Sequence, residues 1–131
     1  SVRYSVITPH DESLRVDGFS NLFCAGEKVG LLVGHTEAIG TGLLAGHNAA
    51  RASFRLPPIA LPRELAIGDI IAFILEQLKT KEGLKAKYTF SGSLYFERMK
   101  ELNLYTTDIT RIRNRVKKAG LFNIFNQKLI D

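Results

Sequence analysis

The residues with the clearest capacity for chemistry lie between positions 21 and 51, where glycines are interspersed with acidic, histidine and small side chains. Residues 22–26 read as a mostly apolar, buried strand, and residues 27–35 as a loop punctuated by glycine. From Thr36 to about Arg51 the pattern predicts a helix with Thr36 at its N-cap. Free N–H groups and the helix dipole at such a start favour electron-rich oxygen or developing negative charge. We therefore expect a binding site at the start of this helix.

The glycines of this region would let a ligand or a second backbone approach closely. Gly26, Gly30 and Gly34 would allow a ligand to lie against the loop, and Glu27 could accept hydrogen bonds from its hydroxyls. Within the helix, small residues share one bare flank: Ala38, Gly42, Ala45 and Ala49, with Gly46 beside them. That flank indicates either close helix–sheet packing or contact with a flat ligand, and the spacing alone does not choose between them.

Three other patterns in this region do not support a site. Residues 40–45 (GTGLLA) match the G-x-G-x-x-A dinucleotide fingerprint, but they lie inside the predicted helix and not in the turn after a strand. His35 and His47 lie twelve residues apart on one helix, or about 18 Å, so one metal ion cannot bind both. Cys24, in a predicted buried strand, reads as a small apolar residue. We therefore expect no metal site, and because no Ser/His/Asp grouping is indicated, the catalytic residues stay unassigned.

Charge is unevenly distributed along the 131 residues. Residues 1–80 carry seven Lys and Arg against eight Asp and Glu, and residues 81–131 carry eleven against five, so the formal net charge of +5 comes from the second part. No apolar run reaches the length of about 18 residues that a membrane span needs. The first residues lack the apolar stretch of a signal peptide, and a lone cysteine suits a reducing compartment. We therefore expect a cytoplasmic protein without a membrane partner.

The order of patterns predicts an α+β fold, in which a small β-element with one long glycine-rich helix precedes a small helical lobe. Strand-like runs at 2–7 and 14–16 come before the apolar run at 22–26. Three of the four prolines lie in residues 53–64, which reads as an extended linker. The predicted order is thus a first unit at 1–52, the linker at 53–64 and the helical lobe at 65–131.

The lobe is predicted to hold three helices. Residues 67–78 carry a strong amphipathic stripe of isoleucine and leucine. A shorter helix follows Ser93 and stops near Asn103, and a third runs from Thr107 to Gly120. The segment LFNIF at 121–125 is expected to pack back as a last turn.

The third helix of the lobe is basic. Arg111, Arg115 and Lys118 follow at i, i+4 and i+7, a spacing that would allow phosphate contacts. A solvated helix face explains the same residues, because cations are also favoured near a helix C-terminus. The sequence therefore leaves open a basic interaction module that binds RNA or a protein partner and has no activity of its own.

Residues 22–51, with the runs LFCAGEKVG and GHTEAIGTGLLAGHNAAR, resemble the C-terminal FAD-binding segment of the flavoproteins related to glucose-inhibited division protein A, the TrmFO/GidA group. Residues 88–109 also look like that group. The resemblance implies an FAD-binding, oxidoreductase-like parent protein, in a group that includes tRNA uracil methyltransferases. It places Gly26 and Glu27 near the ribityl or pyrophosphate part of FAD. It places five further residues near the pyrimidine edge of the flavin: Gly34, His35, Thr36, Glu37 and Ala38.

The same resemblance implies that the chain is a fragment. Such flavoproteins begin with a strand, a G-x-G-x-x-G turn and a helix that hold the ADP part of FAD, and no acceptable version of that unit is present here. We therefore expect the chain alone to be inactive and not to hold FAD tightly, while the full-length parent does. The implied partners are the remainder of the FAD-binding domain and, if the basic helix is used, tRNA.

Overall fold

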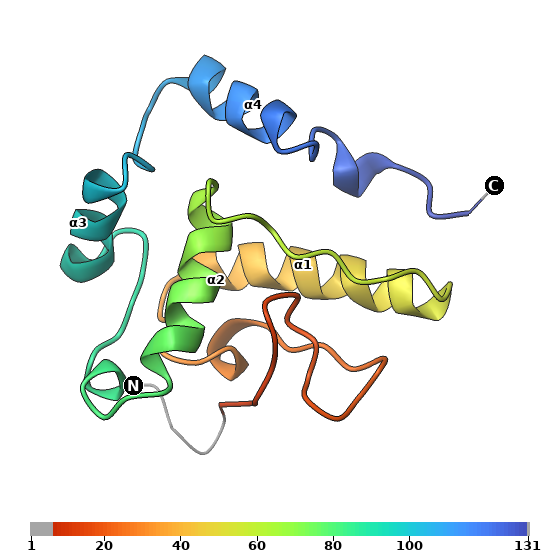
Figure 1. Cartoon of the computed structure of the whole chain (residues 1–131), viewed down its shortest axis with the longest axis horizontal. Coiled ribbons are helices and arrows are strands. Elements are labelled where there is room, and N and C mark those ends of the chain that lie inside the picture. The colour runs from red at the N-terminus through yellow and green to blue at the C-terminus, as the bar shows by residue number, and fades with distance from the viewer. Residues whose placement is uncertain (1–6, 131) are drawn as a thin grey trace.

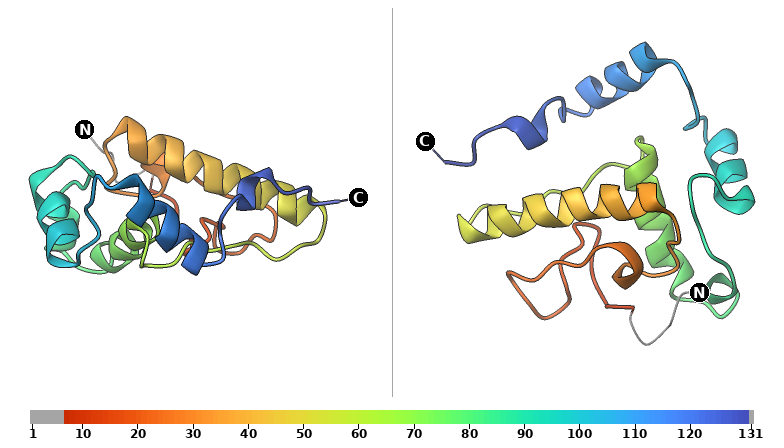
Figure 2. Two further views of the ribbon diagram at one scale, coloured as in Figure 1. Left: turned by 90° about the horizontal axis from the view of Figure 1, so that it is seen from above. Right: turned by 180° about the vertical axis from the view of Figure 1, so that it is seen from behind.

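The structure is a computed structural model that describes residues 7–130, apart from the side chain of Ser93. Four α-helices carry the architecture: α1 (His35–Ser53), α2 (Ala66–Gln77), α3 (Ser93–Glu101) and α4 (Ile109–Lys118). Three short 3-10 turns accompany them: η2 (Gly26–Lys28) before α1, η3 (Gly83–Lys85) between α2 and α3, and η4 (Ile124–Asn126) after α4. Figure 1 shows α1 and α2 crossing, with the N-terminal loops on one side and α4 with the C-terminal segment on the other, and the right-hand view of Figure 2 shows the same arrangement from behind.

The predicted α+β fold is wrong, because residues 7–130 form no sheet. Their β-pairing is limited to three isolated bridges: His10 with Val16, Arg15 with Phe23, and Leu32 with Tyr88. The runs predicted as strands at 14–16 and 22–26 form no regular ladder. Leu14 has a positive φ of 69°, which a strand does not tolerate, and in the run 22–26 only Cys24 is buried. Leu31, in the predicted loop, also has a positive φ, of 60°. The predicted strand at 2–7 falls almost wholly outside the described residues.

The long glycine-rich helix is confirmed as α1, but its predicted N-cap at Thr36 is wrong. The cap is Gly34, with extended φ and ψ of −109° and 156°, and the helix begins at His35. The buried face of α1 is partly polar and consists of Glu37, Thr41, Leu44, Ala45 and Asn48. On the opposite face Ile39 and Leu43 are 73% and 53% exposed, and a Cβ added at Gly42 or Gly46 would meet no atom within 4 Å. The bare flank predicted from the sequence is therefore open in this chain at Ala38, Gly42, Gly46 and Ala49, whereas Ala45 belongs to the buried face.

The three predicted helices of the lobe are confirmed as α2, α3 and α4. The stripe on α2 is the best buried, because Ile70, Ile71 and Ile74 are at most 1% exposed. The chain leaves α3 at Asn103 and α4 at Gly120, both with positive φ angles. The turn predicted at 121–125 occurs as η4, where Phe125 lies edge-on to the His47 ring of α1 at 5.0 Å between centroids.

One apolar core joins these parts. Its largest fully buried apolar side chains come from the N-terminal loops, α1, α2 and α3: Leu14, Val29, Leu31, Leu44, Ile70, Ile71, Ile74 and Tyr95. Each such side chain contributes about 1.5–3 kcal/mol relative to an exposed one. The loops that precede α1 and the helices that follow the linker therefore stabilise one another. The boundaries at 52 and 65 stay a prediction.

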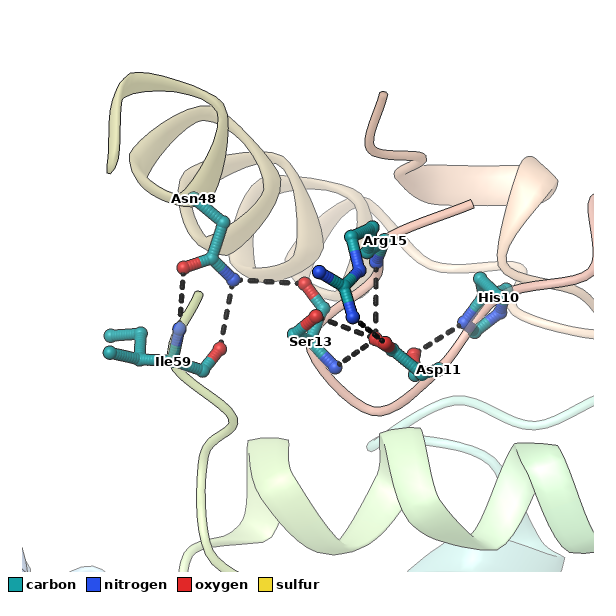
Figure 3. Close-up of polar contacts among 6 residues, drawn as sticks. All are labelled: His10, Asp11, Ser13, Arg15, Asn48 and Ile59. Carbon is teal, nitrogen blue, oxygen red and sulfur yellow. Dashed lines mark hydrogen bonds and ion pairs between the residues drawn. The ribbon is translucent and has the colours of Figure 1, made fainter. Parts of the chain in front are cut away.

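A buried amide holds the linker against α1 (Figure 3). The Asn48 side chain is fully buried, and its Nδ2 donates to the carbonyl oxygens of Ser13 and Ile59 at 2.9 and 2.8 Å. The N–H of Ile59 donates to Asn48 Oδ1 at 2.8 Å. One side chain thus satisfies backbone groups in a loop and in the linker that no sheet or helix satisfies.

Candidate functional site

The start of α1 presents backbone donors that the described part of the chain does not cap. No side chain accepts from the first turn of α1, whereas at α4 the Asp108 carboxylate accepts from the N–H groups of Thr110 and Arg111. His35, Thr36 and Ala38 are exposed there. The first N–H groups of a helix have no partner within the helix and carry its positive dipole end. This place can therefore bind a carbonyl, phosphate or enolate oxygen.

The loop before α1 is held in place by Thr41. The N–H of Gly26 donates to Thr41 Oγ1 at 2.9 Å, and that hydroxyl donates in turn to the Glu37 carbonyl at 2.8 Å. Gly26 has a φ of 61°, and a Cβ built on it would meet nothing within 4 Å. Glu27 beside it is exposed. The loop therefore offers open backbone and an exposed carboxylate next to the helix.

Glu37 turns away from this surface. Its side chain is 1% exposed, and Oε1 accepts hydrogen bonds from the Thr89 hydroxyl at 2.8 Å and from the N–H of Phe90. Oε2 is buried and has no hydrogen-bond partner among residues 7–130. A Cβ on Gly34 would overlap this oxygen, so the carboxylate lies directly against the N-cap glycine. Of the residues predicted to face a cofactor, Glu37 is the one that the fold places inside.

A cleft of about 810 Å³ opens beside Thr36. Its walls come from the start of α2, from α3 and from α4, and its lining is mainly aromatic and aliphatic: Phe90, Phe96, Met99, Leu104, Tyr105 and Ile112. Thr89, Phe90 and this cleft were missed by reasoning from residue patterns, because their approach to α1 is a long-range contact. The only signal in the sequence was the family resemblance at 88–109, which indicated that the segment matters but did not predict that it contacts α1.

The family described as Glucose inhibited division protein A matches residues 1–56. The resemblance predicted from residues 22–51 is therefore confirmed. Residues 1–56 contain the loop with Gly26 and all of α1, so this candidate site lies within the part similar to the glucose inhibited division protein A family.

The curated relatives are tRNA-modifying enzymes by name. Three proteins called methylenetetrahydrofolate--tRNA-(uracil-5-)-methyltransferase TrmFO are similar to this chain. That of Symbiobacterium thermophilum is 44% identical over 55 residues, which is 42% of this chain and 12% of the relative. That of Caldicellulosiruptor bescii is 37% identical over 70 residues, 53% of this chain and 16% of the relative. That of Thermus thermophilus is 38% identical over 81 residues, 62% of this chain and 18% of the relative.

The chain thus matches less than a fifth of the length of these relatives. The match to the Thermus protein is longer than the 56 residues of the family match, so it includes residues beyond α1. No solved structure matches the chain.

The basic helix α4 divides its cations between two roles. Arg115 turns toward the body and donates to the carbonyl oxygens of Leu104 and Asn103 at 2.9 and 2.7 Å. Arg111 and Lys118 are exposed, and neither forms an ion pair in residues 7–130. Of the three residues predicted to contact phosphate, two are free to do so and one closes the end of α3.

Other candidate chemistry is sparse in the described residues. Burial is the main cause that raises the pKa of Cys24 to about 11, so its thiol is protonated and unreactive near neutral pH. Between residues 7 and 130 no group of three His, Cys, Asp or Glu side chains could hold a metal ion. The same part of the chain has no helix long and apolar enough to cross a membrane.

Proposed function

We propose that this chain is the C-terminal part of an FAD-dependent flavoprotein of the TrmFO/GidA group that acts in tRNA modification. The observation that carries the proposal is the start of α1, where uncapped N–H groups and exposed side chains lie within the segment that matches the family. The relatives are named as tRNA uracil methyltransferases, and the transfer of that activity to the parent of this chain is part of the proposal. A cytoplasmic location follows from the same substrate and is equally part of it.

The residues at this place fit a flavin nucleotide. The open backbone at Gly26 would let the ribityl or pyrophosphate part approach closely, and the exposed Glu27 could accept hydrogen bonds from the ribityl hydroxyls. The first-turn N–H groups, with His35, Thr36 and Ala38 exposed around them, suit the pyrimidine edge, which carries electron-rich oxygens. When bound, FAD supplies electron or hydride transfer. The protein supplies orientation and an electrostatic environment that stabilises negative charge on the ring.

The outer face of α1 supports the presence of a larger domain in the parent. Ile39 and Leu43 are exposed there beside Gly42 and Gly46, and the face carries no charged residue. A long helix of a separate small domain normally shows a polar outer face. We propose that the remainder of the FAD-binding domain covers this face.

The first experiment compares flavin binding by this chain and by the full-length parent. Each is purified, and the visible absorption of bound flavin is recorded. The proposal predicts stoichiometric flavin on the parent and none retained by the chain. A parent without flavin would contradict it.

A proline substitution tests the N–H donors directly. His35→Pro removes the first N–H of α1, and proline is well tolerated at the first position of a helix because that N–H has no partner within it. We expect His35→Pro to weaken FAD binding by the parent about tenfold, the effect of one hydrogen bond to an electron-rich group. His35→Ala controls for loss of the imidazole. Ile109→Pro, at the first position of α4, is the matched control for the substitution itself.

A second candidate function rests on α4. Its Arg111 and Lys118, which are exposed and form no ion pair within the described residues, favour contact with a polyanion such as tRNA. A tRNA contact through α4 is compatible with the flavoprotein proposal. If the parent has no flavin chemistry, the same contact would make this chain a basic interaction module. The salt dependence of RNA binding tests whether these cations contact phosphates or only face solvent.

A further inference from the structure

Two segments more than fifty residues apart meet at the start of α1. Glu37 lies in the first turn of α1, and its Oε1 accepts from Thr89 and from Phe90. Just before them, the N–H of Tyr88 donates to the Leu31 carbonyl at 2.8 Å, next to the bridge with Leu32. The segment 88–91 is therefore fixed to the helix and to the loop that leads into it.

The Glu37 carboxylate is closely enclosed. It is 1% exposed, and within residues 7–130 no Lys or Arg pairs with it. The positive end of the α1 dipole favours an acidic side chain in the first turn. A Cβ on Gly34 would overlap Glu37 Oε2 and come within 2.8 Å of Thr89 Oγ1. Gly34, Glu37 and Thr89 thus form one packed junction in which each member restricts the others.

The junction fixes the position of residues on two sides of the cleft. Thr36 and the pair Phe90 and Ser91 line the same cleft, and each neighbours a residue of the junction. The Glu37 side chain is buried behind this surface, so a ligand at the helix start would touch its neighbours and not the carboxylate. Its effect on a ligand is therefore exerted through the orientation of the first turn and of residues 89–91.

We propose that Glu37 is a positioning residue for the cofactor site and that Thr89–Ser91 form the second wall of that site. The proposal rests on the proposed flavin function, because it assigns a wall to the same site. It makes the helical lobe part of the cofactor site. A flavin ring held by the first turn of α1 would lie with Phe90 and Ser91 at its side, and the aromatic cleft would adjoin it.

Amide hydrogen exchange in this chain tests the junction itself. The N–H of Phe90 donates to Glu37 Oε1, so we expect it to exchange slowly. Glu37→Ala should increase its exchange rate about tenfold or more, whereas Glu37→Gln, which keeps an acceptor oxygen, should leave it within about threefold. Glu12→Ala, an exposed acidic residue in the N-terminal loop, is the control. Unchanged exchange of Phe90 in Glu37→Ala would overturn the junction.

FAD binding by the full-length parent tests the positioning role. Glu37→Ala should raise the FAD dissociation constant about tenfold and shift the visible band of the flavin, while Glu37→Gln restores both. Thr89→Val keeps the shape of the side chain but removes its hydroxyl, and should raise the FAD dissociation constant by less than Glu37→Ala does. It replaces Glu37→Ala as the test if that variant does not fold. The thermal midpoints of the flavin-free proteins are measured in parallel.

The experiments distinguish a failure of the positioning role from a failure of the proposed flavin function. Lower thermal midpoints with an unchanged dissociation constant and an unchanged visible band would show a merely structural residue and overturn the proposal. A wild-type parent that carries no flavin would overturn the flavin function, and the positioning role with it, even where the exchange data confirm the junction.

Discussion

Asn48 and Ile59 exchange two hydrogen bonds, one from the Asn48 amide to the Ile59 carbonyl and one from the Ile59 N–H to the Asn48 side-chain oxygen, each 2.8 Å long. This pair of hydrogen bonds resembles the pair between two backbone residues of an antiparallel sheet, with the Asn48 side-chain amide in place of one of them. It fixes the proline-rich linker to the C-terminal half of α1, close to Ser13, whose carbonyl accepts the second N–H of the amide. The linker is thus part of the folded body.

Asn48→Ala should destabilise the chain strongly. It leaves the buried Ser13 carbonyl and the half-buried carbonyl and N–H of Ile59 without this partner, and each unsatisfied buried group costs about 1–3 kcal/mol. We expect the free energy of unfolding in urea to fall by about 3 kcal/mol or more. Asn114→Ala, on the exposed face of α4, is the matched control and should change it by less than about 0.5 kcal/mol. A small loss in Asn48→Ala would mean that water replaces the amide.

Asp69, buried in α2 and hydrogen-bonded to Tyr95 and Arg98 of α3, should make the stability of the fold fall in acid. Burial opposes the charged form, but hydrogen bonds from Arg98 and Tyr95 outweigh it and hold the pKa of Asp69 below its ordinary value of 3.8. Since the folded carboxyl binds its proton less readily than the unfolded one, its contribution is fully present above about pH 3.8. It is lost as the pH falls through the lower, folded pKa.

Tyr95→Phe removes the hydroxyl that donates to Asp69 Oδ2 at 2.6 Å. Near pH 7 we expect a loss of about 1.5–3 kcal/mol, the usual contribution of a hydrogen bond to a charged group. The difference from wild type should shrink as the pH is lowered below about 3.8, because the carboxyl then becomes protonated in both proteins. Tyr105→Phe, at a half-exposed tyrosine, is the control. A difference that stays constant into acid would contradict the coupling to Asp69.

The helices could be predicted from the sequence because their apolar spacing is local. Ile70, Ile71 and Ile74 lie on one side of α2 whatever they pack against. The N-terminal loops could not be predicted, because a buried apolar run has the same composition in a strand and in an irregular loop. The positive φ angles of Leu14 and Leu31 follow from tertiary packing, which no residue pattern in those runs reports.

The candidate site, too, could be predicted from the sequence only in part. The start of α1 could be located from glycines and helix signals, although Gly34, and not Thr36, is its cap. Both residues are acceptable caps, so propensity alone does not fix the first residue of the helix. The inward turn of Glu37 depends on Thr89 and Phe90, which fold against it from another part of the chain. A long-range contact of this kind has no local signature.

Two helix glycines should respond oppositely to alanine. A Cβ on Gly42 would meet nothing within 4 Å, so Gly42→Ala should stabilise this chain by up to about 1 kcal/mol through helix propensity. A Cβ on Gly68 in α2 would overlap the Pro62 carbonyl oxygen, so Gly68→Ala should destabilise by about 1–3 kcal/mol. Urea unfolding of both variants measures the contrast.

The full-length parent extends this comparison. If the remainder of the FAD-binding domain covers α1, Gly42→Leu should cost the parent about 1–3 kcal/mol by overpacking. The same substitution in the isolated chain should cost nothing. An unchanged or raised thermal midpoint of the parent variant would show that the flank stays solvated there.

The cations of α4 should separate into two classes in RNA binding. Arg111 and Lys118 are exposed, whereas Arg115 donates to the Asn103 and Leu104 carbonyls. Each phosphate neutralised contributes a slope of about −0.7 to −0.9 to the dependence of log affinity on log salt. Replacing Arg111 and Lys118 together by alanine should therefore flatten the slope by up to about 2 units. The RNA preference should not change, because phosphate contacts position the protein without reading sequence.

Arg115→Ala provides the internal contrast. It removes one positive charge from the same helix but should mainly lower the thermal midpoint, because it leaves the two carbonyls at the end of α3 without their donor. Replacing Lys79 and Lys81, two exposed cations beyond α2, by alanine controls for net charge. Filter binding of bulk tRNA to the parent across a salt series measures all four slopes. Equal slopes in the wild type and the Arg111 and Lys118 double variant would make α4 a solvated face, and any tRNA contact of the parent would then lie outside this helix.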